Sequence, residues 1–428
     1  MPNIIVIGAG LAGLSAAVHL AKKNHNIKLI EATPKLGGRT YSFYDDKSGL
    51  NLDNGQHIMV GCYKFTLDFL RTIGALHKLE FQENLKVVFI DTFGKKHNLE
   101  STNFIYPLNL FFGILDYSAV SIFDRINILI FAAKLFLRLD KNELFDSIDK
   151  WLLFNNQNEK INKALWEIIA IGALNTSLQK GSPKIFASIL REIFFTGNFS
   201  STIIVPKTDL SELFCSDAEN FLLKKNCEVN KSERLTEIIF ENKIAVKLIT
   251  DKNVYSEFDY CILALPSYAM NKVKNIENVL DLNSLNYSTS GILTFHIFLK
   301  ENKLQEKFYG LIDSPIHWVF NHKEYLTLVT SDADEIITKE NEELFDIAAA
   351  ELKQYLGIER ANIIRYQVVK EKRATVIPDN NFLRNRPTAK TSIENLFLAG
   401  DWTATDLPST IEGAIKSGKI VSEIINSK

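Results

Sequence analysis

The sequence is poor in cysteine, and its cysteines do not come in pairs. Its 428 residues contain four of them, Cys62, Cys215, Cys227 and Cys261. No two stand in a CxxC pair or at the spacing of metal ligands, so we expect no metal site. Scattered single thiols are typical of a reducing compartment, where we expect them to be buried and inert.

An excess of charge of one sign is also missing. The chain has 49 basic and 51 acidic residues, which leaves a formal net charge of −2. No global field would therefore attract nucleic acid or an anionic surface. We expect no nucleic-acid partner, and any contact with a polyanion must be local.

The sequence also lacks a long uncharged apolar run. Its most apolar region, residues 104–139, is interrupted by charged residues and contains no stretch of about 18 uncharged apolar ones. The first apolar run, residues 4–7, has no positively charged region before it, which argues against a signal peptide. We therefore expect a cytoplasmic protein without a membrane-spanning helix.

The chain begins with a motif that is typical of dinucleotide binding. The apolar residues 4–7 break into Gly8-Ala9-Gly10-Leu11-Ala12-Gly13 and then into a helical pattern. This pattern predicts a strand, a tight turn and a helix whose N-terminus binds a pyrophosphate. Gly8 allows the turn, Gly10 allows backbone N–H groups to approach the ligand, and Gly13 allows the helix to lie close to the strand.

GxGxxG alone is weak evidence, because glycine-rich turns also occur for purely structural reasons. Here a second apolar run, residues 27–30, ends in Glu31-Ala32, at about the spacing where a carboxylate binds the adenosine ribose hydroxyls. A ribose 2′-phosphate would be repelled there. Gly37-Gly38-Arg39-Thr40 then resembles the FAD-binding segment of the amine oxidase and phytoene desaturase superfamily, in which the basic residue serves the pyrophosphate and the flavin.

A second cofactor motif lies near the other end of the sequence. A predicted strand, residues 395–399, stops at Gly400-Asp401, and residues 408–414 open the last predicted helix. We expect Asp401 to bind a ribityl or phosphate hydroxyl. The helix N-terminus, with Thr410, Ile411 and Gly413, would place backbone donors where a reduced flavin carries negative charge.

The fold class predicted is α/β, with a Rossmann-like FAD-binding domain of the glutathione reductase and amine oxidase type and an interleaved substrate domain of mixed sheet and helices. The length suggests two or three domains. We assign residues 1–75, 205–266 and 388–428 to the FAD domain and residues 76–204 and 267–387 to the substrate domain, whose apolar helical part is 104–200. Residues 104–139 hold more apolar side chains than one helical face needs, which predicts a thick core or, alternatively, an apolar tunnel or membrane-docking surface.

Several further segments resemble hydroxysqualene dehydroxylases, a family of FAD enzymes of bacterial hopanoid pathways. The segments are Asp53-Asn54-Gly55-Gln56-His57, Ala173-Leu174-Asn175-Thr176, Val205-Pro206-Lys207 with Leu210-Ser211-Glu212-Leu213-Phe214, Glu371-Lys372-Arg373-Ala374-Thr375, and residues 398–403 with 407–414. The resemblance implies tightly bound FAD, a C30 isoprenoid alcohol as substrate, and reductive removal of its hydroxyl as water. It also implies that Gly55, Gln56 and His57 lie near the flavin and that Leu235 packs on the adenine.

Because hydroxide is a poor leaving group, this reaction needs a proton donor, for which His57 or Asp53 are the candidates. That these residues only hold the loop or the flavin stays open. The insolubility of the substrate favours peripheral contact with the inner face of the cell membrane, and the sequence does not indicate the electron donor. Two departures from the family pattern stand in the last turn, Asp406 for glycine and Ser409 for alanine, and we expect Asp406 to face solvent.

Three alternatives are left by the sequence. A carotenoid-type desaturase shares the Gly-Asp-aromatic ending but moves hydride from substrate to flavin. A flavin amine oxidase is a weaker form of this reading, and no cysteine follows Cys261 to attach the flavin covalently. A non-enzymatic FAD-binding scaffold at the membrane is the third.

Overall fold

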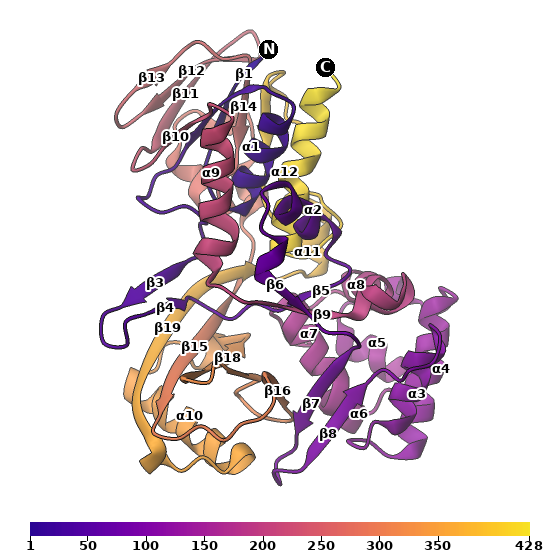
Figure 1. Ribbon diagram of the computed structural model, residues 1–428. Coiled ribbons are helices and arrows are strands. Elements are labelled where there is room, and N and C mark those ends of the chain that lie inside the picture. The colour runs from indigo at the N-terminus through magenta and orange to yellow at the C-terminus, as the bar shows by residue number, and fades with distance from the viewer.

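The computed structural model describes residues 1–282 and 285–428 of the chain (Figure 1). The glycine turn of the N-terminus belongs to a five-stranded parallel sheet of order β10-β2-β1-β14-β20. Its strands are β1 (Asn3–Ile7), β2 (Asn26–Ile30), β10 (Glu228–Asn230), β14 (Tyr260–Leu263) and β20 (Leu396–Leu398). Because the carboxyl ends of parallel strands share one edge, Gly8, Glu31 and Gly400 lie along the same edge.

Each face of this sheet is covered by a different layer. Ile4 and Val6 pack against helices, whereas Ile5 and Ile7 pack against a three-stranded antiparallel sheet, as the period-2 alternation of a strand requires. The helices are α1 (Leu11–Lys22), α2 (Lys64–Thr72), α9 (Asp217–Lys224) and α12 (Ile411–Asn426). The strands of the covering sheet are β11 (Leu235–Glu241), β12 (Ile244–Thr250) and β13 (Val254–Tyr255).

The second large sheet has seven strands in the order β19-β15-β18-β17-β16-β7-β8. Its strands are β7 (Lys86–Ile90), β8 (Lys96–Glu100), β15 (Thr289–Leu299), β16 (Phe308–Leu311), β17 (Trp318–Asn321), β18 (Tyr325–Ser331) and β19 (Ile363–Val376). All neighbours are antiparallel except β16 and β7. One face packs against α10 (Asn341–Leu356) and the other against a layer of helices.

That helical layer is the apolar region of the sequence (Figure 1). It contains α3 (Leu108–Asp116), α4 (Ile122–Phe136), α5 (Ile148–Phe154), α6 (Glu159–Ile161), α7 (Glu167–Leu174) and α8 (Pro183–Phe195). Phe131, Trp151 and Phe186 are fully buried in its core. The surplus of apolar residues is not all buried, because Ile105 is 78% exposed and Phe123 is 76% exposed. Among the described residues, no helix is long and apolar enough to cross a membrane.

Short elements connect the two large sheets. The hairpin of β3 (Ser42–Asp45) and β4 (Leu50–Asp53) leads to β5 (Met59–Val60), which pairs with β9 (Ile203–Pro206), and β9 also pairs with β6 (Leu79–Phe81). Helix α11 (Asn380–Asn385) lies between β19 and β20 in the sequence. In Figure 1 both termini lie at the far end of the five-stranded sheet, so the first turn of α12 points toward the second sheet.

Candidate functional site

The three glycines of the first turn differ in what surrounds them. Gly8 has φ +98°, and a Cβ there would lie 2.6 Å from the carbonyl oxygen of Ala264. A Cβ on Gly13 would lie 1.9 Å from the carbonyl oxygen of Gly8, so only glycine allows α1 to lie this close. A Cβ on Gly10 would meet nothing within 4 Å. Because α1 also begins without a side-chain cap, open space borders the free N–H groups of its first turn.

Glu31 closes the edge of the sheet beside this turn. Its Oε2 accepts the N–H of Ala9 at 2.7 Å, and its Oε1 accepts the N–H and the hydroxyl of Thr33, both at 2.9 Å. The side chain is buried. A carboxylate has about four acceptor sites, so Glu31 has capacity left for a ribose hydroxyl. Ala32 follows it and is half-buried.

The Gly-Gly-Arg segment lies directly on the glycine turn. The N–H of Gly37 donates to the carbonyl of Ala9 at 2.8 Å, and a Cβ on Gly38 would lie 3.2 Å from the Cα of Gly10. Gly37 and Gly38 have φ +104° and +61°, the left-handed region that favours glycine. The N–H of Thr40 closes the turn by donating to the carbonyl of Gly37 at 3.1 Å. The glycine turn and the Gly-Gly-Arg segment, both predicted to bind FAD, therefore lie side by side.

The C-terminal motif meets this surface through Arg39. Its Nη1 donates to the carbonyl of Ala374 at 2.9 Å, and its Nη2 donates to Oδ1 of Asp401 at 2.7 Å. Burial opposes ionisation of Asp401, but the charge of Arg39 and hydrogen bonds from Arg39 and Ser409 hold its pKa below the usual value. The hydroxyl of Ser409 donates to Oδ2 of Asp401, a bond that the alanine of the family pattern could not make. Asp406 is exposed, as expected, and its φ of +60° explains why glycine is common there.

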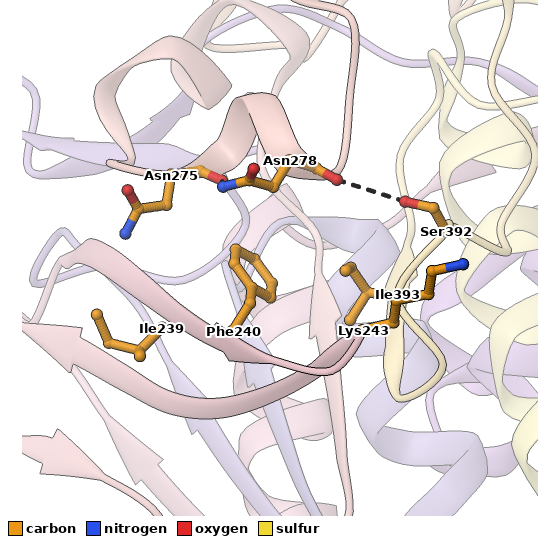
Figure 2. Close-up of a pocket in the computed structure, with 7 residues that line it drawn as sticks. All are labelled: Ile239, Phe240, Lys243, Asn275, Asn278, Ser392 and Ile393. Atoms are coloured by element: carbon orange, nitrogen blue, oxygen red, sulfur yellow. Dashed lines mark hydrogen bonds between the residues drawn. The ribbon is translucent and has the colours of Figure 1, made fainter.

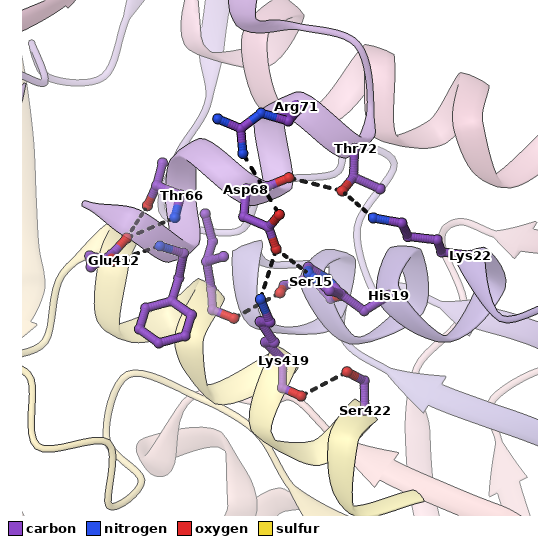
Figure 3. Close-up of polar contacts among 12 residues, drawn as sticks. Ser15, His19, Lys22, Thr66, Asp68, Arg71, Thr72, Glu412, Lys419 and Ser422 are labelled. Atoms are coloured by element: carbon purple, nitrogen blue, oxygen red, sulfur yellow. Dashed lines mark hydrogen bonds and ion pairs between the residues drawn. The ribbon is translucent and has the colours of Figure 1, made fainter. Parts of the chain in front are cut away.

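The first turn of the last helix is fixed by its own side chains and by α2 (Figure 3). Thr410 caps α12 by accepting the N–H of Gly413 at 3.3 Å, and a Cβ on Gly413 would lie 2.4 Å from the carbonyl oxygen of Pro408. The buried carboxylate of Glu412 accepts the N–H groups of Phe65 and Thr66 at 2.9 and 2.8 Å and the hydroxyl of Thr66 at 2.6 Å. It therefore caps α2 from α12, while Ile411 lies beside it, half-buried.

A second contact between α2 and α12 lies further along both helices. Asp68 of α2 forms ion pairs with Lys419 of α12 at 2.8 Å and with Arg71 at 4.0 Å, and its Oδ2 lies 3.5 Å from Nε2 of His19 in α1 (Figure 3). Burial and the charge of Lys419 lower the pKa of His19, although Ser15 and Asp68 oppose this. Helix α2 and the two helices that follow the predicted cofactor turns, α1 and α12, are thus held together by polar contacts.

Asp53 is the last residue of β4, and its side chain is held by two donors. Its Oδ1 accepts the N–H of Leu210 at 2.9 Å and the hydroxyl of Ser42 at 2.7 Å, and its carbonyl accepts Nε2–H of His296 at 2.9 Å. Burial raises the pKa of Asp53 to about 6, although the two donors to Oδ1 oppose the shift. Its Oδ2 has no hydrogen-bond partner among the described residues. The carboxyl group is therefore fixed through one oxygen and free at the other.

The next residues of the loop lie between the cofactor surface and the second sheet. Asn54 donates from Nδ2 to the carbonyl of Arg39 at 2.8 Å, and a Cβ on Gly55 would lie 3.4 Å from the hydroxyl of Thr294 on β15. The Oδ1 of Asn54 and the Oγ1 of Thr294 are both buried without a partner among the described residues. Buried polar atoms of this kind indicate a missing ligand or water.

Gln56 and His57 are half-buried and make no hydrogen bond to any of the residues that the structure describes. Burial lowers the pKa of His57 to about 4, so the ring is neutral at pH 7. The side chain is half-buried, and part of its surface stays accessible. His57 and Asp53 share a loop, but no hydrogen bond joins their side chains.

Two other motif segments have a structural role. Asn175 ends α7 with φ +49°; its Oδ1 accepts the N–H of Asp332 at 2.9 Å and its Nδ2 donates to the hydroxyl of Thr375 at 2.8 Å. The hydroxyl of Tyr41 donates to Oε1 of Glu371 at 2.8 Å. The end of β19 thus connects helix α7 to the segment that carries Arg39.

No contact among the described residues joins Leu235 to the glycine turn. It begins β11, is buried, and packs with Ile5 and Ile7 on the sheet face opposite α1. Its proposed contact with adenine stays a prediction. A hollow further along this layer, between β11 and β12 and the segment 275–278, is lined by none of the predicted site residues (Figure 2).

Sequence reasoning missed a group of half-buried apolar residues that share one core. Ile58 and Val60 follow His57 in the sequence, and Ile292, Trp318 and Ile169 come from β15, β17 and α7. All pack against the core between the second sheet and the helical layer. Alternation in residues 289–299 could have indicated the face of Ile292, but no local signal could place α7 opposite it.

Comparisons with known proteins agree with this geometry. The sequence pattern of the flavin containing amine oxidoreductase family matches residues 11–426. The hydroxysqualene dehydroxylase of Zymomonas mobilis is 28% identical over 98% of this chain and 98% of its own, and the 15-cis-phytoene desaturase of an Oncidium hybrid is 24% identical over 99% of this chain and 77% of its own. The crystal structure of an oxidoreductase from Methanosarcina mazei superposes with a TM-score of 0.77 at 17% identity, covering 98% of this chain and 100% of that one.

The residues of the glycine edge fit FAD. The open space at Gly10 and the uncapped start of α1 fit its diphosphate. The acceptors of Glu31 fit a ribose, and the paired Arg39 and Asp401 fit the ribityl side. The chain belongs to the flavin-containing amine oxidoreductases and is an FAD-dependent oxidoreductase.

Proposed function

We propose that this enzyme reductively removes the hydroxyl of hydroxysqualene, a C30 allylic alcohol, and releases squalene and water as a step of squalene and hopanoid biosynthesis. The observation that carries the proposal is the loop from Asp53 to Val60. It sets two groups able to exchange a proton beside half-buried apolar side chains, and similarity to a hydroxysqualene dehydroxylase over nearly the whole chain supports it.

In this reaction the C–O bond of the alcohol breaks, its oxygen leaves as water after accepting a proton, and a hydride makes the new C–H bond. Reduced FAD supplies the hydride when it is bound. Gly10, Gly38 and Arg39 would hold the diphosphate side of the cofactor, and Asp401 with the first turn of α12 would hold the ribityl and flavin side. The electron donor that reduces the enzyme is of unidentified class.

The proton comes from Asp53 or His57. Asp53 has the more suitable acidity, since a pKa of about 6 leaves a fraction protonated near neutral pH and its Oδ2 is free. His57 makes no hydrogen bond within the described chain and keeps accessible surface, but its pKa of about 4 keeps the ring neutral. Neutral imidazole could orient the alcohol rather than protonate it.

The apolar side chains support an isoprenoid substrate. Ile58, Val60 and Ile292 present hydrocarbon around the loop, and the indole of Trp318 adds an aromatic face that can stabilise an allylic cation. A hydrocarbon chain gains roughly 0.8 kcal/mol for each CH₂ that it buries. An enzyme for a small polar amine would gain nothing from such a wall.

We also propose that the exposed apolar residues of the helical layer rest on the inner face of the cytoplasmic membrane. Phe104, Ile105, Phe111, Phe123 and Ile130 are all exposed. Apolar side chains that stay exposed on and just before the neighbouring helices α3 and α4 favour contact with a membrane interface over packing within the protein core. A C30 hydrocarbon would then enter from the lipid.

The test is the direction of hydride transfer. Protein reduced by light under anaerobic conditions is mixed with hydroxysqualene, and we expect the flavin to reoxidise while squalene forms in equal amount. Oxidised protein should not react with squalene or phytoene. If the alcohol leaves the reduced flavin unchanged and phytoene bleaches the oxidised flavin, the enzyme is a desaturase, the activity named for the Oncidium relative.

A further inference from the structure

The indole N–H of Trp318 is the one among the four tryptophans that lacks an acceptor in the described structure. The indoles of Trp151, Trp166 and Trp402 donate to the carbonyl of Asp140, to Oε1 of Gln157 and to the carbonyl of Leu265, at 2.8, 2.9 and 2.9 Å. Trp318 makes no such bond, and its ring is half-buried. Its Nε1 keeps accessible surface, so this donor is open to a ligand.

The register of the second sheet places Trp318 on the face that carries the loop of His57. Five neighbouring strands, β15, β18, β17, β16 and β7, each contribute one residue to a directly paired row. In that order the residues are Thr294, Val329, Trp318, Gly310 and Phe89. Paired residues point to the same face, so Trp318 lies on the face of Thr294, the residue beneath Gly55. One strand separates the two, which is about 10 Å at the usual strand spacing.

A glycine on β16 lets the indole lie in this position. A Cβ on Gly310 would be 2.5 Å from the ring of Phe89 and 3.4 Å from the ring of Trp318. The two rings lie 6.2 Å apart between their centroids, and Phe308 is 6.3 Å from Trp318. The ring is therefore held by neighbours on one side, and its orientation is fixed.

The opposite side of the indole faces a second glycine, on helix α7. A Cβ on Gly172 would lie 3.7 Å from both Nε1 and Cζ2 of Trp318, so the missing side chain leaves the N–H edge uncovered. Gly172 is exposed although α7 is apolar on all sides, and Ile169 and Ala173 beside it are half-buried. An apolar helix that leaves one face open beside an unpaired donor borders a space for a ligand.

We infer that the indole N–H of Trp318 donates a hydrogen bond to the hydroxyl oxygen of the isoprenoid alcohol, and that Gly172 keeps this donor accessible. Trp318 is then a specificity-determining residue, since it offers a hydrogen-bond donor beside apolar side chains and distinguishes the alcohol from the hydrocarbon product. The inference rests on the proposed function. It assigns the substrate contact and leaves the proton donor with Asp53 or His57.

The first test compares two ligands of the oxidised holoenzyme, in which no reaction occurs. Dissociation constants for hydroxysqualene and for squalene are measured in the same detergent. Trp318→Phe keeps an aromatic face but removes the N–H, so affinity for the alcohol should fall about 3- to 10-fold while affinity for squalene stays unchanged. Equal changes for both ligands, or no change for the alcohol, would overturn the inference.

Gly172→Ala provides an independent variant, because it covers the N–H edge from the opposite side. Alanine favours a helix over glycine, so the unfolding temperature should stay the same or rise while affinity for the alcohol falls at least 3-fold. The matched control is Trp166→Phe, which removes an indole N–H already bonded to Gln157. It should lower the unfolding temperature and leave the preference for alcohol over squalene unchanged.

The two proposals fail in different ways. If the enzyme does not convert hydroxysqualene but Trp318→Phe selectively weakens alcohol binding, the dehydroxylation is wrong and the alcohol contact stands. If conversion is normal and both Trp318→Phe and Gly172→Ala keep the wild-type preference for the alcohol, the dehydroxylation stands and this contact is wrong.

Discussion

The guanidinium of Arg39 and the carboxylate of Asp401 form an ion pair of 2.7 Å that joins positions 362 residues apart in the sequence. Asp401 is buried, whereas Arg39 is about one-third exposed. The pair connects the Gly-Gly-Arg segment to the end of β20, the two segments that the sequence predicted to bind FAD from the two ends of the chain.

Breaking this pair should destabilise the protein and weaken FAD binding. Asp401→Asn leaves Arg39 without its counter-charge, and we expect a loss of about 2–3 kcal/mol in unfolding free energy, less than for a fully buried pair because Arg39 is partly hydrated. Thermal unfolding and the flavin-to-protein absorbance ratio measure both effects. Glu301→Gln, which breaks an exposed pair with Lys303, is the control and should change neither.

FAD should be bound tightly but not covalently. Purified protein should be yellow, and acid precipitation should release the flavin into the supernatant. Glu31→Arg removes the ribose acceptor and the bonds to Ala9 and Thr33, so the dissociation constant for FAD should rise at least 10-fold. Flavin that stays with the precipitate would contradict non-covalent binding.

The pH dependence of flavin reoxidation by the alcohol should identify the proton donor. The acid must be protonated, so the rate should fall as the pH rises through its pKa: near pH 6 if the donor is Asp53, and near pH 4 if it is His57. Asp53→Asn and His57→Ala are measured separately by stopped-flow absorbance. Loss of the donor should slow reoxidation about 100-fold or more and leave the flavin spectrum intact. Full rates in both variants would place the acid elsewhere.

The cap that Glu412 provides to α2 should matter for stability. Glu412→Gln replaces a carboxylate that accepts three hydrogen bonds with an amide that has one acceptor, so unfolding free energy should fall by about 1–3 kcal/mol. Glu423→Gln changes an exposed residue of the same helix and should have no effect. Equal unfolding temperatures for the two variants would refute a role for this cap.

Membrane contact should depend on the most exposed apolar side chains. Replacing Ile105 and Phe123 with Ser should reduce flotation with phospholipid vesicles and leave FAD in place. Phe112, an obvious choice from the sequence, is unsuitable because it is half-buried against Phe104 and Phe111. Val254→Ser, an exposed apolar residue of β13, is the control, and unchanged flotation of the Ile105 and Phe123 variant would reject the proposed surface.

The sequence was informative where the chemistry is local. The glycine turn, Glu31 and the Gly-Asp ending could be located because each needs particular residues at fixed spacings, and the fold class is confirmed. Trp318 could not be found, since its position depends on strand register and on a glycine of a distant helix. The division into domains, the adenine contact of Leu235 and the catalytic roles of Asp53 and His57 stay predictions.

The order of the five-stranded sheet has a consequence for synthesis. β20, an edge strand, pairs with β14, and Asp401 follows it directly, so the flavin side of the site does not exist until residues 396–413 have left the ribosome. At that moment β1, β2 and the whole helical layer have already been translated. Because Asp401 and α12 come last in the chain, we expect the cofactor to be loaded only after the rest of the fold has been translated.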